Sequence, residues 1–365
     1  MKDINRYRGC LIGGAVGDAL GYPVEFWLEE EIFSHYGEKG ITEYAIENGD
    51  VLISDDTQMT LFTANGLLLA ATNGESLTNL NVYPQYIGIC YRDWLKTQRF
   101  EEFGVLPQRA AWLNNIPALN HPRAPGNTCI SALFSPVLGS MDTPLNNSKG
   151  CGGVMRVAPI GLFFDETTPP EEITRLGGEA AALTHGHELG YLPAAMLAQM
   201  IHRLTHYEGC TLLSAVEDAK DALLAYFPNT TAMEALMELV DRAVSLATGH
   251  PMDDLDAIHL LGAGWVAEET LAIAIYCALR HETDFKAAVI AAVNHEGDSD
   301  STGAVTGNIL GARLGLDAIP KKFLDRLELR DTILEIADDL YHRGPLPGEE
   351  ARWEAKYVNH SYPTL

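Results

Sequence analysis

Apolar side chains recur at intervals of three and four residues along most of this chain. The pattern is clearest over residues 60–73, 189–209 and 268–281, where it predicts buried helices. Residues 167–185 add a helix start, because Thr168 stands at an N-cap position, prolines fill the first turn and Glu171 has capping-box spacing. Strand patterns are scarce. We therefore expect an all-α fold, an orthogonal bundle of about a dozen helices.

The chain carries no obvious domain boundary. Its 365 residues could bury a large core, and length alone suggests more than one domain. However, no low-complexity linker and no repeat of fixed period divides it, so we predict a single domain over residues 1–365, with the tail from residue 345 at its periphery. Residues 100–160, rich in Asn, Pro and Gly, form the least helical part.

Two segments carry a glycine at every fourth position. Each such glycine costs a helix about 1 kcal/mol relative to alanine, but a smooth stripe lets two backbones approach closely. Because Asp18 and Arg313 interrupt the two stripes, we expect packing inside a core rather than dimerisation in a membrane. The two helices should pack near the centre, against each other. The stripes are Gly9, Gly13, Gly17, Gly21 and Gly303, Gly307, Gly311, Gly315.

Oxygen-bearing side chains gather in three places that could form a metal site. Hard divalent cations bind carboxylate and hydroxyl oxygens. Converging carboxylates would repel one another without a cation, and a pair of metals can both relieve that repulsion and activate water. Each segment is also a good helix N-cap, so capping is the alternative. The three places are Glu25, then Ser54 with Asp55 and Asp56, then Asp298 with Asp300 and Ser301.

The amino-acid composition limits the classes of molecule that this protein is expected to bind. A net charge of −25 argues against general nucleic-acid binding and against an anionic membrane surface, although a local backbone nest can still bind phosphate. No apolar run reaches the roughly 18 residues that span a bilayer. The first ten residues lack a signal-like apolar core, and the six cysteines are scattered without a C-x-x-C pair. We expect reduced thiols and a cytoplasmic location.

Six segments, in the same order along nearly the whole chain, resemble the ADP-ribosylglycohydrolase family, whose members include dinitrogenase reductase-activating glycohydrolase and the ADP-ribosylarginine and ADP-ribosylserine hydrolases. The resemblance implies an all-α domain around a central cleft that binds ADP-ribose and two Mg²⁺ or Mn²⁺ ions. The segments are residues 9–26, 54–61, 146–161, 182–191, 262–274 and 296–315.

The resemblance assigns roles to the acidic segments. Glu25 matches a mobile glutamate that serves as general base or gating ligand, and Asp55 and Asp300 also belong to the catalytic centre. Asp93 is a weaker candidate for an acid, with a solvated helix residue as its alternative. Serine replaces the family's more common threonine at both hydroxyl positions. The implied metal ligands are Ser54, Asp55, Asp56, Asp298, Asp300 and Ser301.

The segment NNSKGCGGVMR resembles the family's phosphate loop, whose backbone amides from Ser148 to Gly153 would cradle a diphosphate. Lys149 departs from the family pattern, and Cys151 reads as structural because no base lies near it in sequence. His185 matches a ligand-side histidine, and His187 is a second candidate for that position. The implied substrate-binding residues are Ser148, Lys149, Gly150, Gly152, Gly153 and His185.

The implied function is hydrolysis of the bond between ADP-ribose and a modified protein side chain, most often arginine. ADP-ribosylserine or another ADP-ribose conjugate is the alternative substrate. A non-catalytic ADP-ribose-binding or immunity-type protein, with a toxin as partner, is the alternative class. Residues 100–125 and the tail 348–365 are where such a partner would bind.

Overall fold

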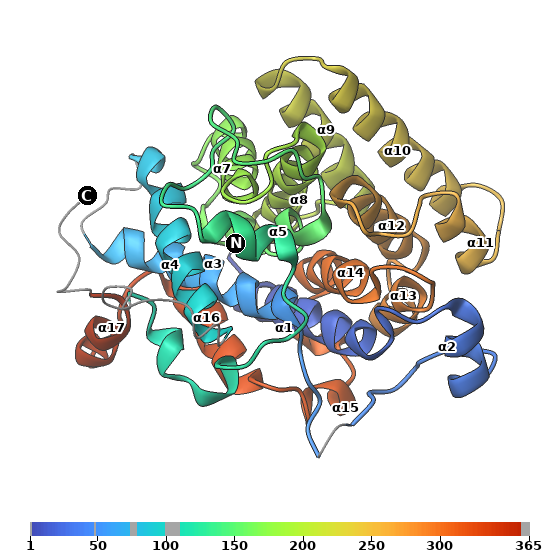
Figure 1. Ribbon diagram of the computed structural model, residues 1–365, viewed down its shortest axis with the longest axis horizontal. Coiled ribbons are helices and arrows are strands. Elements are labelled where there is room, and N and C mark those ends of the chain that lie inside the picture. Colours follow the sequence, from blue (N-terminus) through green and yellow to red (C-terminus); the bar gives the residue numbers. More distant parts are fainter. Residues whose placement is uncertain (1, 47–48, 74–78, 99–109, 359–365) are drawn as a thin grey trace.

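The computed structural model describes residues 2–46, 49–73, 79–98 and 110–358 (Figure 1). Within these ranges the chain forms seventeen α-helices, six short 3-10 helices and no β-strand, with two isolated bridges, Val51 with Leu327 and Gly150 with Val266. The all-α prediction is confirmed. None of the described helices is both long and apolar enough to cross a bilayer.

The helices begin and end as follows. The α-helices are α1 Ile4–Gly21, α2 Glu29–Tyr36, α3 Asp55–Thr72, α4 Tyr83–Thr97, α5 Asn127–Leu133, α6 Ala158–Phe163, α7 Pro170–Ala182, α8 Glu188–His206, α9 Leu212–Tyr226, α10 Thr231–Thr248, α11 Asp254–His259, α12 Ala267–Arg280, α13 Phe285–Val293, α14 Ser299–Leu314, α15 Lys321–Leu324, α16 Arg330–His342 and α17 Glu350–Tyr357. The 3-10 helices are η1 Tyr22–Val24, η2 Leu80–Val82, η3 Trp112–Asn115, η4 Pro117–Leu119, η5 Cys151–Gly153 and η6 Leu316–Ala318.

The two glycine-striped helices, α1 and α14, pack against each other at the centre, as predicted. A Cβ atom added to Gly13 or Gly17 would collide with the carbonyl oxygen of Gly307 or Gly303, respectively. These collisions are with backbone atoms, so no side chain could move aside. Contact between the two backbones therefore offsets the helix cost of the glycines.

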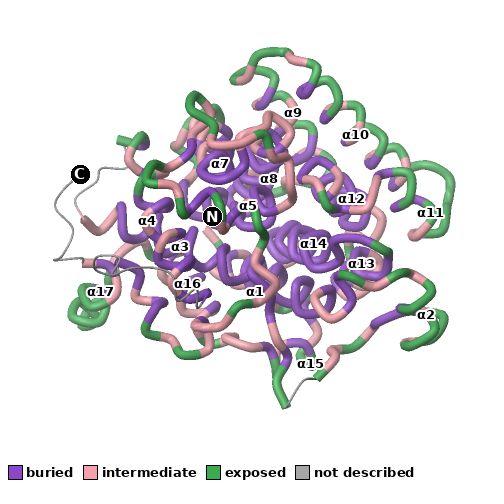
Figure 2. The backbone as a smooth tube through the Cα atoms, viewed as in Figure 1, coloured by how far each residue is buried: buried purple, intermediate pink, exposed green. Residues whose placement is uncertain are grey.

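The core surrounds this central pair. Figure 2 shows buried backbone along α1, α3, α8, α12 and α14, while exposed positions concentrate on α2, α10 and α17. The described part of the tail is less peripheral than expected: Tyr357 of α17 is fully buried, and its hydroxyl donates to Asp339 (2.7 Å). Parts of both proposed partner surfaces lie outside the described residues, namely residues 100–109 of the first and 359–365 of the second.

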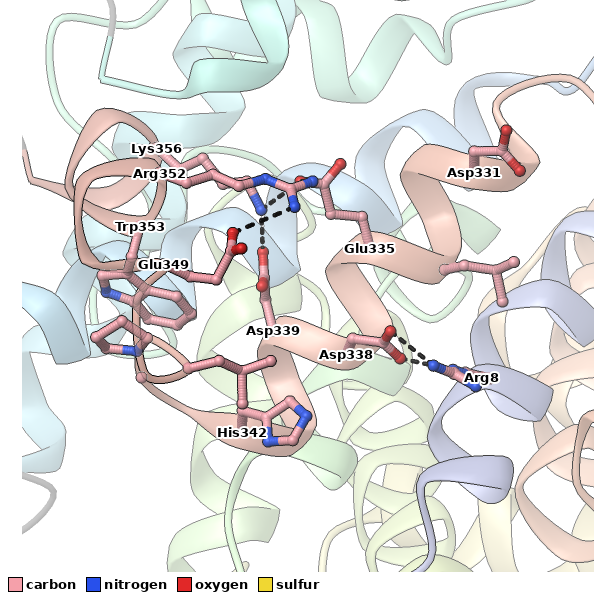
Figure 3. A pocket seen from close by; sticks show the side chains of 14 residues that line it. Arg8, Asp331, Glu335, Asp338, Asp339, His342, Glu349, Arg352, Trp353 and Lys356 are labelled. Atoms are coloured by element: carbon pink, nitrogen blue, oxygen red, sulfur yellow. Dashed lines mark hydrogen bonds and ion pairs between the residues drawn. The ribbon is translucent and has the colours of Figure 1, made fainter.

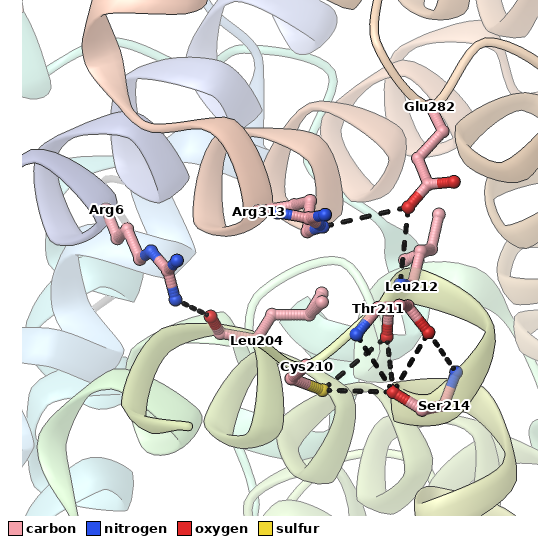
Figure 4. Close-up of polar contacts among 8 residues, drawn as sticks. All are labelled: Arg6, Leu204, Cys210, Thr211, Leu212, Ser214, Glu282 and Arg313. Atoms are coloured by element: carbon pink, nitrogen blue, oxygen red, sulfur yellow. Dashed lines mark hydrogen bonds and ion pairs between the residues drawn. The ribbon is translucent and has the colours of Figure 1, made fainter. Parts of the chain in front are cut away.

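Local sequence signals set several helix ends. Thr211 caps α9 through a reciprocal pair of hydrogen bonds with Ser214, and the guanidinium of Arg6 donates to the Leu204 carbonyl at 2.6 Å, joining α1 to α8 (Figure 4). The predicted cap at Thr168 is wrong. Helix α7 starts one residue later, with Pro169 at the N-cap and no side-chain cap, because two prolines preset its first turn.

Candidate functional site

A cavity of about 340 Å³ collects residues from widely separated parts of the chain. The acidic starts of α3 and α14, the segment after η1, the loop before α5 and the loop at η5 all line it. Nine of the predicted site residues meet there: Glu25, Asp55, Asp56, Gly150, Gly152, His185, Asp298, Asp300 and Ser301.

Two helix N-termini position the acidic side chains. The Ser54 hydroxyl caps α3 by accepting the amide of Asp56 (3.2 Å), and the Asp298 carboxylate caps α14 by accepting the amide of Ser301 (3.2 Å). Ser54 and Asp298 therefore do serve as helix caps, but this role does not exclude a metal site formed by the neighbouring side chains. The caps orient the first turns so that the neighbouring carboxylates face the cavity, while Ser54 itself is buried and is not among the lining residues.

Asp18 of α1 holds the start of α3 in place. Its fully buried carboxylate accepts the amides of Ser54 (2.9 Å) and Thr57 (3.1 Å) as well as the Thr57 hydroxyl. Burial raises the pKa of Asp18 to about 6, against these hydrogen bonds. The sequence indicated Asp18 only as an interruption of the glycine stripe. Its signal was a lone acid within the apolar second half of α1.

The lining carboxylates share a strongly negative environment. Burial, followed by the charges of Asp298 and Asp55, raises the pKa of Glu25 to about 9. Burial likewise raises the pKa of Asp55 to about 8 and holds that of Asp56 and of Asp300 well above its usual range. No lysine or arginine of the described chain forms an ion pair with any of these five residues.

This oxygen set fits hard divalent cations. Among the described residues, one carboxylate oxygen of Glu25 and one of Asp56 are buried without any hydrogen-bond partner, a costly arrangement that a cation would relieve. Within the described ranges, however, no three Asp, Glu, His or Cys side chains converge tightly enough to form a metal site by themselves. The carboxylates surround the cavity rather than enclose one point, so hydroxyl or ligand oxygens would have to complete a metal's coordination.

The glycine loop forms another wall, with fewer available amides than the sequence suggested. The amide of Ser148 donates to Asn146 (3.0 Å), that of Gly150 to the Ser148 hydroxyl (3.3 Å), and that of Cys151 to the Trp265 carbonyl (3.3 Å). Gly150 and Gly152 line the cavity, whereas Ser148 does not. An anion would therefore meet the η5 end of the loop rather than an unbroken row of amides.

Two further residues of the glycine loop, Gly153 and Lys149, contact other parts of the protein rather than the cavity. A Cβ atom on Gly153 would lie 2.7 Å from the Gly190 carbonyl oxygen, so this glycine allows the loop to contact α8. The Lys149 ammonium forms an ion pair with Glu268, at the start of α12. Neither Lys149 nor Gly153 lines the cavity.

Cys151 lies next to the acidic cluster. Its thiol donates to a carboxylate oxygen of Asp298 (2.7 Å), and burial followed by the charges of Asp298 and Asp56 raises its pKa well above the usual range. A thiol that stays protonated is a poor nucleophile. The geometry thus supports a structural role for Cys151.

The loop before α5 and the ring of Phe26 complete the cavity and were not anticipated, whereas Trp265 belongs to a segment that resembles the family's ligand-lining segment. The loop that precedes α5 is fastened to α3, since Asp55 donates its amide to the Arg123 carbonyl (2.9 Å) and accepts the amide of Gly126 (3.2 Å). At the cavity edge, the largely exposed ring of Phe26 stacks on Trp265, with centroids 5.7 Å apart. The only sequence signal for the first wall was the turn-rich segment HPRAPGNTC.

Asp93 lies away from this group. It is fully buried in α4, and its carboxylate accepts the amides of Ala110 (2.6 Å) and Ala111 (2.8 Å) and pairs with Lys96 (2.5 Å). It is not among the residues lining the cavity. Asp93 therefore holds the segment around residues 110–111 against α4.

A larger cavity, of about 630 Å³, lies between α1, α16 and α17 (Figure 3). Its charged groups are paired with one another: Asp338 holds Arg8 through two hydrogen bonds of 2.6 and 2.8 Å, and Lys356 lies 2.6 Å from both Glu335 and Asp339. Each of the five acidic side chains that line this cavity has a basic partner, so none is left as an unpaired carboxylate for a ligand. The smaller acidic cavity is the better candidate for chemistry.

Comparison with known proteins identifies the class. The family model for ADP-ribosylglycohydrolase matches residues 1–350, and the chain belongs to that family. It is 25% identical to ADP-ribosylhydrolase ARH3 of Danio rerio, over 94% of this chain and 92% of the relative. It is 28% identical to ADP-ribosyl-[dinitrogen reductase] glycohydrolase of Rhodospirillum rubrum, over 89% and 91%. A solved structure titled ADP-ribosylglycohydrolase-related protein complex shares the fold, with a TM-score of 0.57 and 24% identity over 93% and 98%.

Proposed function

We propose that this protein is a divalent-metal-dependent hydrolase that releases ADP-ribose from modified protein side chains, with ADP-ribosylarginine as the preferred linkage. One observation carries the proposal: five buried carboxylates line one cavity beside a glycine loop, and two of their oxygens have no partner. Membership of the ADP-ribosylglycohydrolase family supplies the substrate class.

The acidic wall would hold two Mg²⁺ or Mn²⁺ ions through Asp55, Asp56, Asp298, Asp300 and Ser301. The sixth predicted ligand, Ser54, is buried behind this wall and would have to turn its hydroxyl away from the α3 cap to join them. Bound there, the ions would supply orientation of the ribose hydroxyls and activation of water. The adjoining wall, formed by Gly150, Gly152 and His185, would receive the diphosphate. In this arrangement, C1 of the ribose would lie between the acidic cluster and the cavity mouth.

The reaction adds water across the bond between C1 and the side-chain nitrogen. The new C1–oxygen bond forms as the C1–nitrogen bond breaks, and the departing guanidine keeps the electron pair and gains a proton. Cations bound beside Glu25 would lower the pKa of its carboxyl and leave it ionised. Because Glu25 lines the cavity with an unpartnered oxygen, we assign it the task of taking the proton from the attacking water. The negative environment around Asp55 and Asp300 favours the positive charge that develops on the sugar.

The charge of the site is the reason for choosing arginine. A cavity lined by carboxylates attracts a guanidinium group more strongly than a neutral serine hydroxyl. The Phe26–Trp265 pair at the edge adds exposed aromatic faces, on which a planar guanidinium stacks well.

The test is release of ADP-ribose from an arginine-ADP-ribosylated protein, with Mg²⁺, with a chelator and with Asp300→Ala. We expect release that requires the metal and is lost in the variant. A serine-ADP-ribosylated protein is run in parallel: faster release from it would transfer the proposal to that linkage. Tight ADP-ribose binding without release from either substrate would favour the non-catalytic class, and absence of both would refute the assignment of the cavity.

Asp93→Asn separates a structural from a catalytic role for that residue. We expect the free energy of unfolding to fall by about 1–3 kcal/mol, because buried amides lose a charged acceptor. The kcat for ADP-ribose release should stay within about twofold of wild type, since Asp93 lies outside the cavity. Thermal unfolding and steady-state kinetics give the two values. A kcat loss above about 100-fold in a stably folded variant would restore Asp93 as a catalytic acid.

A further inference from the structure

A buried arginine lies behind the glycine loop without a carboxylate partner. Arg156 is fully buried, and no ion pair in the described ranges includes it. Its guanidinium instead lies over the ring of Tyr91, 4.3 Å from the centroid, and donates to the Ala180 carbonyl (3.2 Å) and the Thr184 hydroxyl (2.6 Å). Burying a charge on neutral acceptors costs folding free energy. Arg156 therefore calls for an explanation beyond stability.

The contact with Thr184 dictates where that hydroxyl sends its proton. A guanidinium can only donate, so the Thr184 oxygen is the acceptor in this bond. The hydroxyl proton then has three acceptors within reach in the described chain: Nδ1 of His185 at 2.8 Å, the Ala181 carbonyl at 3.5 Å and the sulfur of Cys129. The shortest contact is the strongest one. If the hydroxyl donates along this shortest contact, Nδ1 of His185 accepts and the ring carries its single proton on Nε2.

We infer that Arg156 and Thr184 are positioning residues that fix His185 as the neutral Nε2–H tautomer. Burial, followed by the charge of Arg156, lowers the pKa of His185 to about 3, so the ring stays neutral at physiological pH. His185 thus offers one N–H donor of defined direction without adding a positive charge beside the acidic cluster.

The Nε2 edge of the ring borders the glycine loop. A Cβ atom on Gly152 would lie 2.9 Å from Cε1 and 3.2 Å from Nε2 of His185, and one on Gly150 would lie 3.4 Å from Nε2. All three residues line the cavity. The Nε2–H group is therefore placed to donate to an oxygen of the ADP-ribose diphosphate. This last step rests on the proposed function, whereas the tautomer assignment does not.

The test combines a spectroscopic and a binding measurement. Protein labelled with ¹⁵N only in histidine is examined by NMR, with His185→Gln used to assign the His185 signals. In the wild type we expect Nε2 to be protonated and Nδ1 to be an unprotonated acceptor. Thr184→Val keeps the shape but removes the hydroxyl, so we expect a mixture of tautomers and ADP-ribose binding weakened about tenfold by calorimetry. Thr184→Ser retains the hydroxyl and should restore both values.

The outcomes separate this inference from the proposed function. A wild-type ring protonated on Nδ1 would overturn the inference without any variant being needed. So would a folded Thr184→Val protein with an unchanged tautomer and unchanged affinity. If the protein shows the predicted tautomer but does not bind ADP-ribose, the roles of Arg156 and Thr184 stand and the proposed function is refuted.

Discussion

Asp56→Asn is expected to lower ADP-ribose release more than about 100-fold while raising the melting temperature of the metal-free protein. Asp56 is almost fully buried, and one of its oxygens has no partner. Burial and the charges of Asp18, Asp55 and Asp298 hold its pKa well above the usual range. Folding without a cation must therefore bury a charge among like charges or take up a proton, and both reduce stability.

Asparagine has nearly the same shape as aspartate and carries no charge, so the substitution removes that cost. We expect a gain of about 1–3 kcal/mol in the metal-free protein, or a few degrees in melting temperature. Addition of a metal ion should have the opposite effect and stabilise the wild type more than the variant. A cation that binds only the native state at 100 times its Kd adds about 2.7 kcal/mol to wild-type stability, and the variant should lose most of that gain.

Thermal unfolding with and without Mg²⁺, together with the release assay, measures all three effects. Asp317→Asn, at an exposed position of η6, is the matched control and should leave each value unchanged. A metal-free Asp56→Asn protein that is less stable than wild type, or one that keeps the full stabilisation by Mg²⁺, would show that the acidic cluster is not a metal centre.

The sequence predicted the acidic and glycine-loop walls of this cavity because their residues belong to short local patterns. Ser54 and Asp298 are recognisable helix caps. The carboxylates next to them lie in the first turns of α3 and α14 and line the cavity. The role of Asp18 depends instead on how α1 packs on α3, which no local pattern encodes. The same holds for Asp93, whose carboxylate binds a loop far from the cavity.

The phosphate loop illustrates the same limit. The glycines in NNSKGCGGVMR indicate that another group lies close to the loop backbone, but they do not show whether it is a ligand or another part of the protein. Gly152 approaches a histidine ring, while Gly153 approaches the α8 backbone. The contacts with Asn146, the Ser148 hydroxyl and Trp265 show that three loop amides are already engaged. Composition thus locates a loop of this kind, and tertiary packing decides which of its amides remain for a ligand.

Gly307→Ala is expected to destabilise the protein by about 3 kcal/mol or more, at the upper end of overpacking effects. Helix propensity alone predicts the opposite sign, a gain of about 1 kcal/mol. Packing wins because the new Cβ would overlap the Gly13 carbonyl oxygen, a backbone atom of α1 that cannot rotate away. Relief requires the two central helices to separate.

That separation would also reach the cavity, since the same helix contact continues through Gly17 and Gly303 to Gly21, which touches the Ser299 backbone beside Asp300. Thermal unfolding with and without Mg²⁺ should therefore show both a lower melting temperature and a smaller gain from the metal. Gly344→Ala is the matched control, because a Cβ atom there meets nothing within 4 Å. A Gly307→Ala protein as stable as that control would mean that α1 and α14 do not pack backbone to backbone, and the position of the acidic cluster between them would need another cause.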